Sequence, residues 1–188
     1  MGKWLNAKVY ECTYRPVPLS EHIVYDSAVY THSHTLESTI PPSDIKELKD
    51  PITNALITLA REAADQNHGV LIFCESRRRC EDLSLLLRTF MVTASDELQS
   101  KRINVLGNLA TTATGLDPVL AKTLPAGVAF HHAGLTTEER DIITAAYNDG
   151  SVKAIFCTAT MAAGVNLPAR RVIISPKMGR DFASAAML

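Results

Sequence analysis

A short stretch near the C-terminus, TATMAAGVN, combines hydroxyl, small and amide side chains. Thr158 and Thr160 follow an apolar run, and their hydroxyls together with the N–H groups of a helix start form a site for an anion such as phosphate. The small residues that end at Gly164 let a sugar-phosphate backbone approach closely. Pro168 cannot continue a helix, so Asn166 is expected in a turn with its amide directed outward. The local alternatives are that the threonines only cap the turn and that Asn166 only holds it.

Two other loops have comparable chemistry. In CESRRR, Ser76 and the three arginines from Arg77 onward stand at a helix start, and in HHAGLTTEER, Gly134 precedes another capped helix start. These two helix starts are the second and the third possible phosphate sites. Three such sites in a row suit a polymer of phosphates better than one small ligand. The alternative for the arginines is a solvated helix face.

The elements that must position these loops alternate along the chain. The apolar run at 69–74 is typical of a strand buried on both faces, and the runs at 127–130, 152–157 and 171–174 are expected to be further strands. Amphipathic helices are expected between them, opening at Asp50, Ser76 and the capping box TTEE at 136–139. The pattern predicts an α/β fold with a parallel sheet and helices on both faces, with all strand carboxyl ends on one edge.

Residues 91–125 are expected to be mostly helical, with breaks at Gly107, Gly115 and Pro118. Residues 20–45 are polar and are expected to form a poorly constrained connection.

Composition narrows the class of protein. The 188 residues are 46% hydrophobic, which fits one globular domain, and the net charge of −1 means that any basic surface must be local. No run is long and apolar enough to span a membrane. The four cysteines form no C-x-x-C pair and are expected to be reduced and mostly buried. His131 and His132 have no cysteine or carboxylate nearby in the sequence to complete a ligand set, so no metal site is predicted.

Taken together, the motifs resemble those of superfamily-two helicases. VLIFCESRRRCEDL resembles motif IV, HHAGL with the following EER resembles the motif IVa region, and TATMAAGVNLP resembles motif V. The resemblance is to the branch that holds the helicase domain of DNA polymerase theta, its helicase-only relatives and archaeal repair helicases. WLNAKVYECTYRPVPL looks like the passage into the second RecA-like domain, and GLDPVLAKTLPAGVAFHHAGL is similar to the polymerase-theta type. The order and spacing extend over most of the chain and are weakest at 20–45 and 91–112.

The resemblance implies the C-terminal, RecA-like half of an ATP-dependent DNA helicase of the 3′–5′ type that acts in DNA repair. Residues 1–20 would lead in from the preceding domain, 21–47 would be a flexible connection, and 48–188 would be the second RecA-like domain, cut before its motif VI. The resemblance implies that the backbone of single-stranded DNA is contacted by Ser76, Arg77, Gly134, Thr158 and Thr160. It also implies that the ATP cleft is faced by Gly164 and Asn166.

The resemblance also implies partners and cofactors. ATP and Mg²⁺ would be bound mainly by a first RecA-like domain of the same polypeptide, and the location would be nuclear in a eukaryote and otherwise intracellular. The sequence contains no G-x-x-x-x-G-K-[ST] loop, and the arginine-rich motif VI would follow after residue 188. We therefore expect no catalytic residue in this chain and no ATPase activity from it alone.

Two alternatives stay open at the level of the sequence. RNA helicases of the same superfamily share the architecture, and the choice of DNA rests on the GVNLPARRVI variant and the polymerase-theta-like stretch. The near-zero net charge and the missing catalytic motifs also suit a non-catalytic α/β domain that binds a partner protein or a small phosphorylated ligand.

Overall fold

The computed structural model describes residues 17–159, 167–175, 177–178 and 181–182. The chain divides into two compact units, residues 1–39 and residues 40–188. No helix in the described ranges has both the length and the apolar character that crossing a membrane requires.

The first unit contains a small antiparallel sheet of three strands, β1 (His22–Tyr25), β2 (Ala28–Thr31) and β3 (Leu36–Thr39), in the order β1-β2-β3. A two-residue loop, Asp26 and Ser27, joins the first two strands. Both loop residues have positive φ angles, 47° and 57°, which is the backbone of the tight turns that match the twist of a hairpin.

This sheet differs from the flexible connection expected over 21–47. Asp-Ser is not one of the glycine-containing pairs by which such turns are recognised, and every residue of β1 is exposed, so no alternation of apolar and polar residues marks the strand. Backbone pairing rather than burial of β1 defines this sheet, and sequence patterns do not report such pairing.

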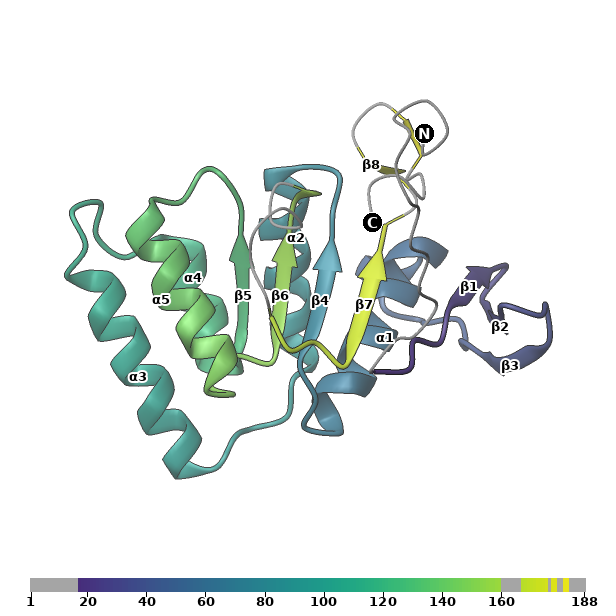
Figure 1. The fold of residues 1–188 in the computed structure, drawn as a ribbon, viewed down its shortest axis with the longest axis horizontal. Coiled ribbons are helices and arrows are strands. Elements are labelled where there is room, and N and C mark those ends of the chain that lie inside the picture. Colours follow the sequence, from purple (N-terminus) through teal and green to yellow (C-terminus); the bar gives the residue numbers. More distant parts are fainter. Residues whose placement is uncertain (1–16, 160–166, 176, 179–180, 183–188) are drawn as a thin grey trace, which may run out of the picture. The chain divides into compact units, whose positions relative to one another are not determined.

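The second unit is built on a four-stranded parallel sheet with helices around it, as the sequence predicts (Figure 1). Its strands are β4 (Val70–Phe73), β5 (Val128–His131), β6 (Ala154–Cys157) and β7 (Arg171–Ile174), in the order β5-β6-β4-β7. All four arrows in Figure 1 point the same way, so the strands end at one edge, which we call the carboxyl edge. A two-stranded antiparallel pair, β8 (Lys177–Met178) and β9 (Asp181–Phe182), follows.

Five α-helices and three short 3-10 turns are found in the described part of this unit. The α-helices are α1 (Pro51–Asp65), α2 (Arg77–Leu87), α3 (Asp96–Ala110), α4 (Pro118–Thr123) and α5 (Thr137–Asn148). The turns are η1 (Lys46–Leu48), η2 (Arg88–Phe90) and η3 (Leu124–Ala126). Helix α1 packs on β4 and β7, whereas α2 packs on β5 and β6.

The helix starts follow the capping residues seen in the sequence. The Asp50 carboxylate accepts from Thr53 N–H with Pro51 in the first turn, and Ser76 Oγ accepts from Arg79 N–H. The expected break at Gly107 is wrong, because α3 runs through it. Gly107 is on an exposed face with nothing near its absent side chain, so its cost is only the roughly 1 kcal/mol of a glycine in a helix.

The two other expected breaks have different outcomes. Pro118 does not interrupt a helix: it stands at the first position of α4, where its missing N–H costs nothing, and Asp117 caps it. Gly115 does lie between helices, with a φ of +72° that favours glycine.

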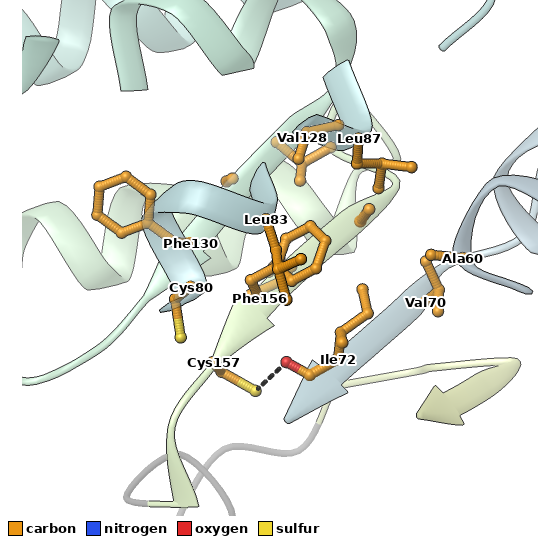
Figure 2. Packing of buried hydrophobic residues seen from close by; sticks show 14 of the residues in the cluster. Ala60, Val70, Ile72, Cys80, Leu83, Leu87, Val128, Phe130, Phe156 and Cys157 are labelled. Atoms are coloured by element: carbon orange, nitrogen blue, oxygen red, sulfur yellow. Dashed lines mark hydrogen bonds between the residues drawn. The ribbon is translucent and has the colours of Figure 1, made fainter. Parts of the chain in front are cut away.

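The core fills the space between the sheet and its helices. Figure 2 shows Leu83 of α2 beside Phe156 of β6 and Leu87 of α2 beside Val128 of β5. These residues belong to one buried cluster with Phe130 and Ile72, all fully or almost fully buried. The expectation of buried, reduced cysteines is met at Cys74, Cys80 and Cys157, which are buried free thiols. Because β4 and β6 are covered on both faces, their sequences are continuous apolar runs.

Candidate functional site

The carboxyl edge is level across three neighbouring strands. The register pairs His131 of β5 with Cys157 of β6, and Cys157 with Phe73 of β4, so the three strands end in one row. The ladder continues one residue further, because Cys74 N–H donates to the Cys157 carbonyl at 2.8 Å. The three loops predicted to bind phosphate therefore leave the sheet side by side, across about 10 Å at the usual strand spacing.

The sequence-predicted residues lie close above this row. Ser76 is the third residue after Phe73, Gly134 is the third after His131, and Thr158 directly follows β6, the strand between them. Ser76 and Gly134 are exposed, and Thr158 is half-buried. Thr160, Gly164 and Asn166, which complete the prediction, lie outside the described residues.

Ser76 caps α2 in a way that leaves a donor available. Its Oγ accepts from Arg79 N–H at 3.2 Å, which uses a lone pair and not the hydroxyl proton. The N–H groups of Arg77 and Arg78, which precede the capped Arg79 N–H, have no carbonyl partner within the helix and point toward the carboxyl edge. Together the hydroxyl proton and these N–H groups can donate to an anionic oxygen.

The three arginines after Ser76 are not equivalent. Arg78 lies 3.8 Å from Asp82, and Arg79 lies 3.8 Å from Glu75 and donates to Thr53 Oγ1 at 2.6 Å. Arg77 is exposed and has no carboxylate partner within the described residues. Of the three, Arg77 is the side chain whose charge is best placed for a ligand.

At the start of α5, where a phosphate site is expected, side chains of the protein itself already occupy backbone donors. Thr136 and Glu139 form the capping box that the sequence predicts, and Thr136 N–H donates to Glu139 Oε2 at 2.6 Å. Glu139 is only 4% exposed. Its burial opposes ionisation, but hydrogen bonds from Thr136 and Thr114 outweigh this and hold the pKa of the carboxyl below its ordinary value. A fixed carboxylate at this helix start repels a phosphate.

Gly134 does not offer a free N–H either. Its amide donates to Nδ1 of the buried His132 at 3.1 Å. What Gly134 provides is space, because a Cβ there would lie 3.0 Å from the His132 ring and 3.7 Å from Arg77 Cδ. The backbone at Gly134 is thus exposed, compact and adjacent to Arg77.

His132 connects this loop to α2. Its Nε2 lies 3.2 Å from Glu81 Oε1, and its ring stacks on Phe130 with centroids 4.8 Å apart at 14°. Because Nδ1 accepts from Gly134, the proton of the neutral ring is on Nε2 and is donated to Glu81. Burial lowers the pKa of His132, Glu81 raises it in part, and Arg77 lowers it further. The neutral ring is therefore favoured at neutral pH.

Two contacts of the site were not found from the sequence. The pairing of His132 with Glu81 joins residues 51 positions apart, and that of Arg79 with Thr53 joins residues 26 apart. The one local signal is the His-x-Gly spacing, which lets a ring nitrogen reach the amide two residues on. Arg140 donates to Thr136 O and Thr137 Oγ1 and so contacts only its own loop and helix start in these two bonds.

Comparison with known proteins identifies the family. Residues 99–185 match the model of the helicase conserved C-terminal domain. The chain is 40% identical over 190 residues to DNA polymerase theta of Mus musculus, covering 93% of this chain and 7% of that protein. It is 40% identical over 194 residues to Helicase POLQ-like of Drosophila melanogaster, covering 97% of this chain and 18% of that protein. It is 35% identical over 175 residues to the ATP-dependent DNA helicase Hel308 of Thermoplasma volcanium, covering 93% of this chain and 22% of that protein.

The chain thus spans 7% to 22% of the length of these relatives. The matched region includes α3, α5 and the strands β5, β6 and β7, and so two of the three loops at the carboxyl edge. The sheet, the motif order and the matched relatives agree: the chain belongs to the superfamily-two helicases of the polymerase-theta and Hel308 type and carries their conserved C-terminal domain.

Proposed function

We propose that this chain is the C-terminal RecA-like half of an ATP-dependent DNA helicase that binds the backbone of single-stranded DNA along the carboxyl edge. The observation that carries the proposal is the register of the sheet, in which three neighbouring strands end level at His131, Cys157 and Phe73. The loops that leave these strand ends at the same edge contain Gly134, Thr158 and Ser76. Hydroxyls, amides and a single arginine bind phosphates without reading bases, so binding is independent of sequence.

The ATP cycle completes this function. In our proposal, a first RecA-like domain of the same polypeptide binds most of ATP and Mg²⁺, and Gly164 and Asn166 close the cleft from this side. Closure and opening around ATP would shift this half along the strand, in the 3′–5′ direction that the resemblance implies.

The domain plan of the sequence remains part of the proposal. Residues 48–188 would belong to the second RecA-like domain, and residues 1–20 would lead in from the first. The relatives that match are named as a DNA polymerase and DNA helicases. By analogy with them we propose DNA as the substrate, repair as the process, and the nucleus as the location in a eukaryote.

The test is a comparison of hydrolysis with unwinding in the full-length protein. The Thr160→Ala variant should retain DNA-stimulated ATP hydrolysis while unwinding of a 3′-tailed duplex falls, because a hydroxyl that holds the strand is lost and the ATP cleft is intact. The matched control is Thr35→Ala, an exposed threonine in the first unit. Unwinding at the wild-type rate in Thr160→Ala would remove this residue from the strand-binding surface.

A further inference from the structure

The β5–α5 loop and the start of α2 are joined beneath the surface by one buried ring. His132, 4% exposed, accepts from Gly134 N–H on one side and donates to Glu81 on the other, at 3.1 and 3.2 Å. Stacking on Phe130 fixes the plane of the ring. Both ring nitrogens are thereby used inside the protein.

The two groups that the ring joins lie next to the candidate DNA-binding residues. Glu81 is four residues after Arg77 on α2 and so shares its helix face. Gly134 is itself in the row, and the position of its absent Cβ is 3.7 Å from Arg77 Cδ. The ring therefore links the loop that carries Gly134 to the helix face that carries Arg77.

We propose that His132 is a positioning residue, which holds the β5–α5 loop against α2 so that Gly134 and Arg77 present one continuous surface to the DNA backbone. This inference rests on the proposed function. It requires the neutral ring with its proton on Nε2, because a proton on Nδ1 would remove the acceptor of the Gly134 amide.

The proposal has a pH signature. The charged and titratable groups that face His132 are Glu81 and Arg77 from α2 and His131, the last residue of β5, which directly precedes it. Because burial lowers the pKa of His132, the neutral ring and its bond to Gly134 are kept at neutral pH and are lost as the pH falls through the lowered pKa. Acidification should thus loosen the β5–α5 loop.

Paired substitutions separate the two bonds of the ring. In His132→Asn the side-chain oxygen is near the Nδ1 position and can still accept from Gly134, whereas in His132→Gln the side-chain amide is near the Nε2 position and can still donate to Glu81. Glu81→Gln keeps an acceptor for Nε2–H, and Glu81→Leu removes it. His68→Gln changes an exposed histidine and is the control.

The experiment measures the 188-residue chain by ¹⁵N NMR and by binding to a fluorescent single-stranded oligonucleotide. We expect a wild-type ring protonated on Nε2 at pH 7 and a Gly134 amide signal that moves in His132→Gln. The affinity should fall about five-fold in both His132 variants and in Glu81→Leu, the effect of about one net hydrogen bond. It should stay within about two-fold of wild type in Glu81→Gln and His68→Gln. The Gly134 signal should also move on acidification of the wild-type chain below pH 6.5 and show no such step in His132→Asn.

The outcomes distinguish the two proposals. A wild-type chain that does not bind the oligonucleotide would overturn the proposed function. Equal affinity of the wild type and both His132 variants for the oligonucleotide would overturn only the positioning role. A proton on Nδ1 of the wild-type ring, or a Gly134 signal that does not move in His132→Gln, would overturn it as well.

Discussion

The guanidinium of Arg79 donates from Nη2 to Thr53 Oγ1 at 2.6 Å, and the same hydroxyl donates to Asp50 Oδ2 at 2.6 Å. This chain of contacts ties the start of α2 to the start of α1, next to the loop that carries Ser76. The Thr53 residue is 5% exposed, so its hydroxyl is held away from competing water. The loop between β4 and α2 is thus supported by α1 as well as by the sheet.

Replacing Thr53 by Val should destabilise the protein by about 1–2 kcal/mol, because two charged partners each lose a hydrogen bond while the volume is kept. In a unit of this size the loss corresponds to a fall in Tm of about 2–8 °C, measured by circular dichroism. The matched control is Thr58→Val on the same helix, whose hydroxyl makes only a 3.5 Å contact with Asn54. An equal loss in both variants would mean that the Arg79 contact contributes nothing.

Asp50 should make stability depend on pH in the acid range. The side-chain hydrogen bond from Thr53 is the main cause of a pKa of Asp50 below its ordinary 3.8. A lowered folded-state pKa stabilises the fold above the unfolded-state value, and this contribution is lost as the pH falls through the folded-state value. The difference in Tm between wild type and Asp50→Asn should therefore shrink as the pH is lowered from 5 toward 2. A difference that is constant over this range would contradict the assignment.

Binding of single-stranded DNA by this chain should depend only weakly on salt. Arg77 is the one arginine at the start of α2 without a carboxylate partner in the described residues, and each neutralised phosphate contributes a slope of about −0.7 to log K against log salt. In Arg77→Ala the slope should become shallower by about that amount, with affinity reduced about five-fold. Arg61→Ala, which removes an arginine paired with Asp65 on α1, is the control for net charge. A slope identical to wild type in Arg77→Ala would exclude Arg77 from phosphate contact.

The isolated chain should show no steady-state hydrolysis of ATP. Phosphoryl transfer needs positioned phosphates, Mg²⁺ and in many cases an arginine finger, and the sequence contains neither a Walker loop nor motif VI. The measurement is phosphate release with and without single-stranded DNA. Turnover that disappears on mutation of Asn166 would refute the expectation, whereas turnover that survives this mutation would indicate a contaminant.

The parallel sheet was predictable because β4, β5 and β6 are continuous apolar runs, as strands covered on both faces require, whereas the edge strand β7 is partly exposed. The helix starts at Asp50, Ser76 and Thr136 were predictable because each depends on a side chain within three residues. Gly107 misled the prediction because an exposed glycine costs α3 about 1 kcal/mol, which the rest of a 15-residue helix offsets. Local chemistry thus predicts where elements begin more reliably than where they break.

At the candidate site, the edge was predictable but the occupancy of its donors was not. Right-handed crossovers place every parallel strand end on one side, so the juxtaposition of Ser76 and Gly134 follows from fold class alone. That the Gly134 amide is already used by His132, and the α5 start by Glu139, depends on side-chain positions that no sequence pattern encodes. Those two contacts occupy donors at the site predicted after β5, whereas phosphate binding at Ser76 and after β6 stays a prediction.

The strand order has a consequence for biosynthesis. Both neighbours of β4 lie after it in the chain: Val70 pairs with Ala154 and with Arg171, so the nearer partner is 84 positions downstream. At about 5–20 residues per second, this apolar strand waits roughly 4–17 s on the ribosome with both backbone edges bare. A nascent chain or a truncation that stops before residue 154 would thus present an unpaired VLIF segment, open to intermolecular β-pairing, and would need a chaperone that recognises short apolar strands.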